Sequence, residues 1–312
     1  MYSPVSLDEL SLSILLLDRT HTSENETHNI IWATDDYSEI QLKSVVEAGS
    51  RGLCPRVGKS REEQERRSRD MAEVFTPAWI CNAQNNLVDA AWFGLNESPF
   101  NKEKDNGWET KNALIPFPTE SGRTWQDYVL DPRLEMACGE APYLVSRYDA
   151  ISGETIPVRD RIGLFDRKLR VVGENAHDEK EWDHWALEAC KSIYGFEWQG
   201  DNLFLARESM LFTYIDHRQA AFGALPRESQ IHKMAEVISW NFWQMDGLKG
   251  VIPGSCHDFV EEIPTLFGEP ERVVTQCKGC SDDDMFRHNG TYCRIKDWKT
   301  GKTIRFIDLI KP

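Results

Sequence analysis

The sequence predicts an α/β protein built on a parallel sheet with flanking helices, and three observations support that prediction. From residue 133 onward, strand-like runs alternate with helices of about 10–15 residues, which implies helical crossovers between parallel strands. The first run leads into a strand-to-helix turn, Arg133-Leu-Glu-Met-Ala-Cys-Gly-Glu-Ala-Pro-Tyr-Leu-Val145, of the kind that borders a ligand crevice. The chain has 312 residues, of which 40% are apolar and 11% aromatic, enough for one large core.

Two helices and a long connection precede the predicted sheet. Residues 59–71 are rich in Glu, Arg and Gln and lack Gly and Pro, which favours a solvated helix. Phe75-Thr-Pro77 should follow its end, because the residue before a proline is pushed out of the helical region. Apolar residues recur at helical spacing over 78–93, whereas residues 94–130 are rich in Asn, Lys, Pro and Gly and predict a long loop or insertion.

The α/β rhythm then divides the chain into elements and regions. We expect strands at 134–137, at 162–165 ending on Asp166, and at 196–199, with helices at 168–174, 181–194, 203–220 and 229–238. The regions are an N-terminal extension (1–60), the α/β domain (61–250), and a Cys-rich segment with a C-terminal β-hairpin (251–312).

Acidic residues at the predicted strand ends indicate an adenosyl-type cofactor. A ribose needs a carboxylate after the second strand to accept hydrogen bonds from its hydroxyls, and Asp166 is placed for that role. Asp201 follows the next strand, where it would meet an adenine ring, and Glu135 lies in register on the first strand. Structural roles stay open, because Asp166 could pair with a neighbouring arginine and Asp201 could cap a helix.

In this order the motifs resemble those of the S-adenosylmethionine-dependent DNA adenine-N6 methyltransferases of restriction–modification systems. The family's Phe-Thr-Pro-like segment is matched by Phe75-Thr76-Pro77, its Leu-Glu-Pro-x-x-Gly-x-Gly turn by Leu134–Ala141, and its Gly-Asp-x-Leu segment by Gly200–Leu203. The sequence departs from the pattern at Ala141, which replaces the second glycine, and at Pro142. The resemblance covers residues 60–250 and implies a Rossmann-like methyltransferase sheet. The residues that it implies for S-adenosylmethionine binding are Phe75, Thr76, Pro77, Glu135, Cys138, Gly139, Asp166 and Asp201.

The catalytic part of the resemblance is more distant. Family members hold adenine with an Asn-Pro-Pro-Tyr-like tetrad, whose Asn accepts hydrogen bonds from the exocyclic amine while the aromatic ring stacks on the flipped base. This chain has no Pro-Pro pair, and the positional equivalent is Val237-Ile-Ser-Trp-Asn-Phe-Trp-Gln-Met-Asp-Gly247, which reads as a strand leading into Asn241. The resemblance implies methyl transfer to adenine N6 in DNA, and the alternative is that these aromatics belong to the core of an inactive fold. The implied catalytic residues are Asn241, Phe242, Trp243 and Gln244.

Cysteines near the C-terminus predict a structural zinc site. A Cys-x-x-Cys pair with two further Cys or His residues supplies the four ligands that such a site needs. We expect Cys277, Cys280, His288 and Cys293 as ligands, and Cys256 lies upstream of them. Free thiols on a surface loop are the alternative. The run 290–309 predicts a hairpin, either the antiparallel edge of the sheet or part of a zinc-stapled recognition module.

The charge of the chain bears on its partners. A net charge of −15 opposes contact with DNA, which requires a basic surface for its phosphates. Basic residues nevertheless gather between Arg51 and Arg69 and between Arg287 and Lys311, where they could face DNA or form ordinary solvated surface. The acidity also suits docking on a more basic partner, such as a separate specificity or restriction subunit.

We expect a cytoplasmic protein with no membrane partner. The longest apolar run, Ile14-Leu-Leu-Leu17, is too short to span a bilayer, and the eight cysteines are mostly scattered, as in reduced proteins. Two other functions stay open. One is a non-catalytic subunit with the S-adenosylmethionine-binding fold that binds DNA or a specificity partner. The other is a zinc-stabilised interaction module with an unrelated α/β fold.

Overall fold

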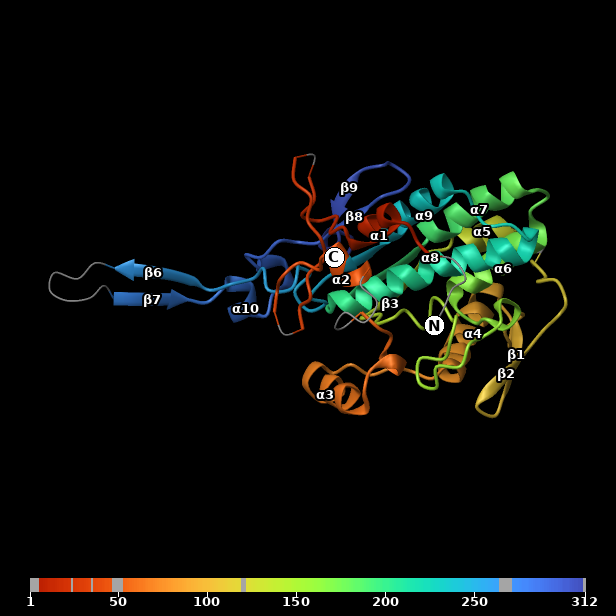
Figure 1. The fold of residues 1–312 in the computed structure, drawn as a ribbon, viewed down its shortest axis with the longest axis horizontal. Coiled ribbons are helices and arrows are strands. Elements are labelled where there is room, and N and C mark those ends of the chain that lie inside the picture. The colour runs from red at the N-terminus through yellow and green to blue at the C-terminus, as the bar shows by residue number, and fades with distance from the viewer. Residues whose placement is uncertain are drawn as a thin grey trace.

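The chain forms a mixed α/β structure, seen in a computed structural model that describes residues 6–23, 25–34, 36–46, 53–118, 122–263 and 271–310 (Figure 1). Its helices are α1 (Glu9–Leu16), α2 (Leu42–Val46), α3 (Arg61–Met71), α4 (Ala78–Phe93), α5 (Trp125–Leu130), α6 (Leu164–Asn175), α7 (Glu179–Lys191), α8 (Gly200–Phe222), α9 (Glu228–Asn241), α10 (Lys278–Asp282) and α11 (Ile307–Ile310). Its strands are β1 (Asn101–Lys104), β2 (Gly107–Thr110), β3 (Arg133–Met136), β4 (Ile193–Glu197), β5 (Phe242–Gln244), β6 (Phe259–Ile263), β7 (Glu271–Thr275), β8 (Arg294–Lys296) and β9 (Thr303–Arg305).

A three-stranded parallel sheet, in the order β3-β4-β5, organises the fold. Helices α6 and α7 connect β3 to β4, and α8 and α9 connect β4 to β5, as parallel pairing requires. Within the described part of the chain no other strand joins this sheet. The predicted α/β class with a parallel sheet is thus confirmed at that level.

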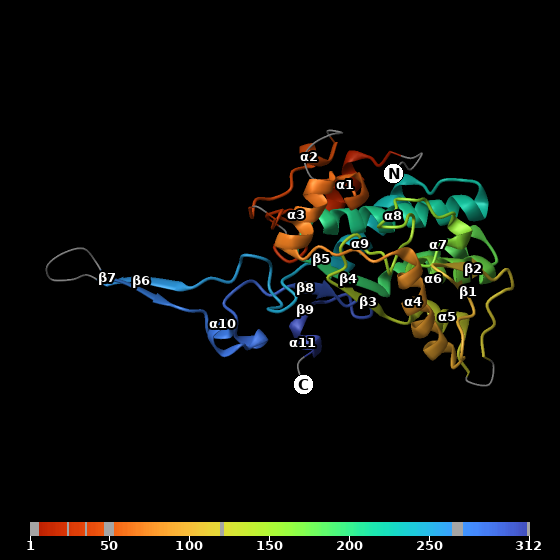
Figure 2. The same ribbon diagram turned by 90° about the horizontal axis from the view of Figure 1, so that it is seen from below.

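Strands β4 and β5 are covered on both faces by different parts of the chain. Figure 2 shows α8, α9 and α1 on one side of β4 and β5, with the β8–β9 hairpin on the other. Ile193 and Phe242 point into the large core beneath the helices, whereas Phe196 and Trp243 pack into a second cluster with Ile295 of β8. This alternation places β4 and β5 between two buried layers, whereas Leu134 and Met136 of β3 are exposed.

Several predicted elements are confirmed by the structure. Strand β3 and helices α3, α4, α8 and α9 form close to where the sequence places them. Their end signals are local: Ser60 caps α3 through the backbone N–H of Glu63, and Gly94 ends α4 in a left-handed conformation.

Other predicted elements are wrong. Residues 162–165 form no strand, because Leu164, Phe165 and Leu169 recur at helical spacing and are buried on one face of α6. The connection 94–130 is not a plain loop, since it contains the β1–β2 hairpin and α5. The run that leads to Asn241 is the end of α9 rather than a strand.

The C-terminal region holds two hairpins outside the parallel sheet. The predicted hairpin is present as β8–β9, which pairs in a sheet of its own. The ribbon β6–β7 was not predicted, and Figures 1 and 2 show it projecting from the body. Among the described residues, no helix combines the length and the apolar character that a bilayer crossing needs.

Candidate cofactor crevice and metal centre

A crevice of about 630 Å³ opens beside the carboxyl ends of β3 and β4. Parallel α/β sheets bind ligands at this edge, and the volume is in the range of small-molecule sites. The lining comes from four parts of the chain that lie far apart in sequence. They are the segment with Ala33, Thr34 and Tyr37, the stretch from Arg69 to Phe75, the turn with Ala137 and Gly139, and the strand end with Glu197, Trp198, Gln199 and Asn202.

The turn after β3 is held in an unusual backbone conformation. Ala137, Gly139 and Ala141 have φ values of 49°, 54° and 61°, in the left-handed region that favours glycine. The Gly139 backbone N–H donates to Oε2 of Glu197 at 2.8 Å. This bond ties the turn after the first strand of the sheet to the end of the second.

Glu197 is the acidic residue that occupies the end of the second strand. Its side chain lines the crevice, although the residue is only 7% exposed, and it also accepts the N–H of Gln199 at 3.1 Å. Burial raises the pKa of Glu197, and the backbone N–H donors only partly offset that effect. Each carboxylate oxygen has a second lone pair, so ligand hydroxyls could still donate to it. The sequence signal was available, because Glu197 ends an apolar run.

A buried ionic network fixes the wall of the crevice. Arg67 of α3 donates to Glu73 at 2.6 Å and to Gln199 at 2.5 Å, and its guanidinium lies 2.9 Å from the carboxylate of Asp201. Burial alone would raise the pKa of Glu73, but the bond from Arg67 lowers it. Asp201 is therefore not free to meet an adenine ring as predicted, because it anchors α3 to α8.

Asp166 is also displaced from its predicted role. It lies in the first turn of α6 rather than after a strand, and it is 1% exposed. Its carboxylate accepts the Ser146 N–H at 2.9 Å and lies 2.9 Å from Nε2 of His217. Asp166 thus fastens the long β3–α6 connection. The position after the second strand, which was predicted for Asp166, is occupied by Glu197.

The remaining predicted cofactor residues divide into lining and support. Phe75 and Gly139 line the crevice. The Glu135 carboxylate accepts backbone N–H groups that follow the turn, and burial raises its pKa well above the ordinary value. Cys138 is buried in the core, Thr76 bonds to the Tyr143 side chain, and Pro77 precedes α4 at the edge of another cavity.

The four predicted catalytic residues are built into the core. Asn241 donates to the carbonyls of Cys190 and Ile193 at 3.0 and 2.9 Å, and its Oδ1 accepts the indole N–H of Trp298 at 2.7 Å. Asn241 is fully buried as well, so its side chain cannot reach a substrate amine, and the structure gives it a structural role in place of the predicted catalytic one. Phe242, Trp243 and Gln244 are at most 3% exposed, so none presents a free aromatic face or amide to a flipped base.

A second candidate site is a cluster of three cysteines and one histidine. The ligand atoms of Cys256, Cys277, Cys280 and His288 all lie within 4.8 Å of one another. Cys256 Sγ lies 3.6 Å from Cys280 Sγ, and Nδ1 of His288 lies 3.5–3.8 Å from the three sulfurs. Tetrahedral zinc, with Zn–S of about 2.3 Å and Zn–N of about 2.0 Å, requires edges of about 3.8 and 3.5 Å. The cluster could therefore hold a metal such as zinc.

The backbone around this cluster supports the same arrangement. A Cβ on Gly279 would lie 2.6 Å from the His288 ring, so only glycine allows the histidine to approach. Burial would raise the pKa of the Cys277 thiol, but the backbone N–H groups of Cys280 and Asn289 lower it to about 6. A lowered pKa favours the thiolate, which is the form that binds metals.

Cys293 does not belong to the cluster, which corrects the predicted ligand set. It is fully buried behind β5, where its thiol donates to the carbonyl of Gln244 at 3.2 Å. Cys256 takes its place because the chain returns to Cys277 after the β6–β7 ribbon. Sequence spacing alone could not distinguish the two cysteines.

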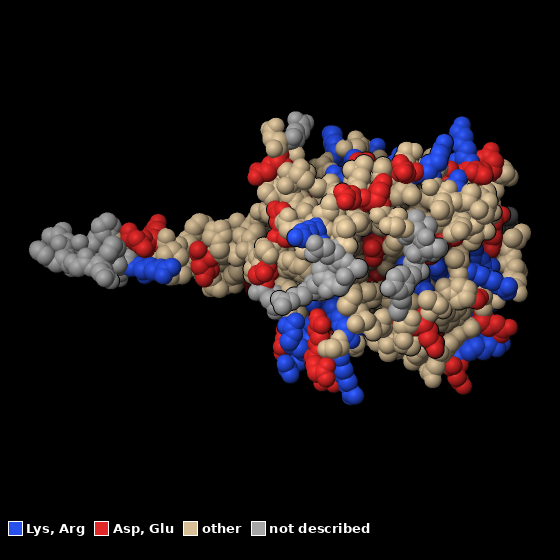
Figure 3. All heavy atoms as spheres, viewed as in Figure 1, with Lys and Arg blue, Asp and Glu red and all other residues tan. Residues whose placement is uncertain are grey.

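The predicted basic surface around α3 carries both signs of charge. Arg61 pairs with Glu65, Arg69 pairs with Asp70, and Lys59 and Arg67 are buried. Figure 3 shows blue and red side chains intermixed where α3 lies. The C-terminal group is also partly paired, for example Arg287 with Asp282. The ends of the two predicted groups, Arg51 and Lys311, lie outside the described residues.

Comparison of the chain with protein-family models, with curated proteins and with solved structures found no match.

Proposed function

We propose that the crevice binds the adenosyl part of S-adenosylmethionine, and that the protein is the cofactor-binding component of a DNA adenine-N6 methyltransferase. The observation that supports this most is Glu197, a buried carboxylate at the end of the second parallel strand, bonded to the Gly139 turn at the end of the first. Ribose hydroxyls are recognised by an acid in this position. In this proposal the sheet is a partial Rossmann-like methyltransferase sheet.

The other lining groups suit such a ligand. Phe75 and Trp198 offer apolar ring surface to an adenine, and Gly139 allows close approach of the backbone. Bound there, S-adenosylmethionine would supply an activated methyl group on its sulfonium. The chain's own part is to hold the ribose through Glu197 and to exclude water with the wall formed by residues 69–75.

The methyl acceptor in this proposal is adenine N6 in DNA, presented together with a separate specificity or restriction subunit. Two observations favour a partner. The net charge of −15 disfavours phosphate contact by this chain alone, and Asn241 is fully engaged within the core.

Calorimetric titration with S-adenosylmethionine tests the proposal. Wild-type protein should bind saturably, and Glu197→Gln should bind about tenfold or more weakly because a charge-assisted hydrogen bond is lost. Asp166→Asn is the matched control, since Asp166 is a buried acid outside the crevice. Absence of binding by folded wild-type protein contradicts the proposal, as would loss in the Asp166 variant with none in the Glu197 variant.

A zinc-stabilised interaction module is the second candidate function, favoured by the position of the Cys3His cluster. Cys256 and Cys277 lie at the two ends of the chain segment that contains the β6–β7 ribbon, so a bound zinc would clamp the root of that projection. Metal analysis of purified protein tests it, with one zinc per chain expected and none contradicting it.

A further inference from the structure

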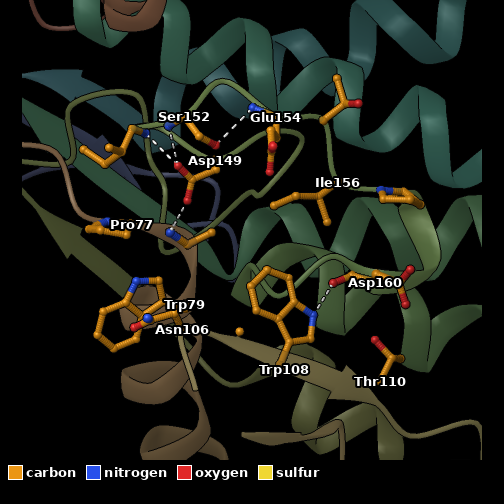
Figure 4. Close-up of a pocket in the computed structure, with 15 residues that line it drawn as sticks. Pro77, Trp79, Asn106, Trp108, Thr110, Asp149, Ser152, Glu154, Ile156 and Asp160 are labelled. Carbon is orange, nitrogen blue, oxygen red and sulfur yellow. Dashed lines mark hydrogen bonds between the residues drawn. The ribbon is translucent and has the colours of Figure 1, made fainter. Parts of the chain in front are cut away.

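A cavity apart from the proposed cofactor crevice lies between α4, the β1–β2 hairpin and the loop that follows β3 (Figure 4). Its volume is about 620 Å³. Phe75 lines the crevice and Pro77 lines this cavity, so one short segment borders both. Two tryptophans from different elements, Trp79 of α4 and Trp108 of β2, flank the space in Figure 4.

The walls of the cavity are tied together by hydrogen bonds. The Asp149 carboxylate accepts the backbone N–H of Ala78 at 2.6 Å, joining the start of α4 to the loop, and it also accepts the N–H groups of Ile151 and Ser152. The indole N–H of Trp108 donates to the carbonyl of Asp160 at 2.8 Å. A ligand would therefore meet a site that is already formed, which lowers the entropic cost of binding.

The chemistry of the lining is electronegative. The indole faces carry negative quadrupole density, and Trp79 is 38% exposed. Glu154 borders the same space with its carboxylate, and Asp160 contributes the backbone carbonyl that accepts the Trp108 indole N–H. The cavity lining contains no lysine or arginine. Such a site attracts cations and repels phosphates and carboxylates.

We infer that this cavity binds an organic cation with a guanidinium or alkylammonium head. The indole faces would contact the charged head, and the Glu154 carboxylate would neutralise it. The volume exceeds what a bare ammonium ion fills, so the head carries an organic body. Its source is either a small molecule or an arginine or lysine side chain of a polypeptide.

Titration with N-acetyl-arginine amide, followed by tryptophan fluorescence and calorimetry, tests the inference. The neutral citrulline analogue has almost the same shape, so it should bind at least about tenfold more weakly. Trp79→Ala and Glu154→Gln should each weaken binding by about tenfold. Glu109→Gln is the matched control, because Glu109 lies on β2 but pairs with Lys104 outside the cavity.

The outcomes distinguish a polypeptide ligand from a small molecule, and both from the absence of a cation site. Tighter binding of a pentapeptide with one arginine between glycines indicates a polypeptide ligand, and tighter binding of the free amide indicates a small molecule. Equal binding of the citrulline analogue, or no saturable binding by folded protein, overturns the inference. S-adenosylmethionine titration of the Trp79→Ala variant keeps this test separate from that of the crevice.

Discussion

The carboxyl ends of neighbouring strands in one sheet differ sharply in this protein. At β3 and β4, Gly139 and Glu197 border an open crevice. At β5 the same edge is closed, because Gln244 donates to the carbonyls of Ile31 and Trp198 at 2.8 and 2.7 Å and accepts the Ile31 N–H at 2.8 Å. Segments distant in sequence decide which end can bind a ligand. In the proposed function the open end would hold the cofactor, whereas the residues at the closed end are structural.

The largest predicted effect concerns two cysteines, Cys256 in the metal cluster and Cys293 at the closed end of the sheet. Cys256→Ser should abolish binding of zinc, since it removes one of four tetrahedral ligands, whereas Cys293→Ser should keep about one zinc per chain. Metal analysis after dialysis measures both. The reverse pattern would restore the ligand set expected from the sequence.

The next effect is on stability at the closed end. Asn241→Ala should lower the free energy of unfolding by about 3 kcal/mol, because it removes the three hydrogen bonds that this buried side chain makes. Denaturant unfolding measures the loss. A stable variant that binds S-adenosylmethionine but has lost methyl transfer would instead return Asn241 to catalysis.

At the open end the expected effect depends on pH. Burial raises the pKa of Glu197 above the value of about 4.3 in an unfolded chain, so the folded protein holds a proton that the unfolded chain has released. Its contribution to stability is therefore present below that value and is lost as pH rises through the folded pKa. Glu197→Gln should remove this dependence, so its stability relative to wild type should rise with pH.

Ligand binding should respond to Glu197 in the opposite direction. The ionised carboxylate is the better acceptor for ribose hydroxyls, so the affinity of wild type for S-adenosylmethionine should increase over the same pH range. Calorimetry at several pH values, with Glu197→Gln beside wild type, measures it. Identical pH profiles for the two proteins would separate Glu197 from the ligand.

The smallest predicted effect is at the turn that borders the crevice. Ala137 is exposed and has a φ of 49°, so Ala137→Gly should relieve backbone strain. Glycine also raises the conformational entropy of the unfolded chain, which offsets part of this gain, so the net stabilisation should be about 0.5 kcal/mol. Thermal unfolding measures it. Destabilisation of this variant would show that the alanine side chain makes a contact worth more than the strain.

Local signals made much of the fold predictable, and their absence explains the errors. Helices α3 and α4 have caps and uninterrupted helical patterns that need no tertiary information. Strand β5 has three residues and follows α9 without a loop, so the predicted strand was placed too early, on the last turn of that helix. Strand β6 is exposed at every residue, so no alternation of buried and exposed positions marks it.

The location of the candidate site was predictable from the sequence, but the acidic residue that borders it was not. The Phe75 segment and the Gly139 turn, which the motif pattern assigned to one site, both line the crevice. The choice between Asp166, Asp201 and Glu197 depends on which acid follows the second strand, and that strand was misplaced at 162–165. The choice between Cys256 and Cys293 as metal ligand likewise depends on the path of the chain after the β6–β7 ribbon, which the cysteine spacing does not show.

The most direct test of the account is to find where S-adenosylmethionine contacts the chain. Ultraviolet crosslinking of the radiolabelled compound to folded protein, followed by peptide mapping, reports this location. The account predicts label in peptides that contain Phe75, Gly139 or Trp198, and competition by unlabelled compound. Competed label confined to the peptide with Asn241 and Trp243 would contradict it.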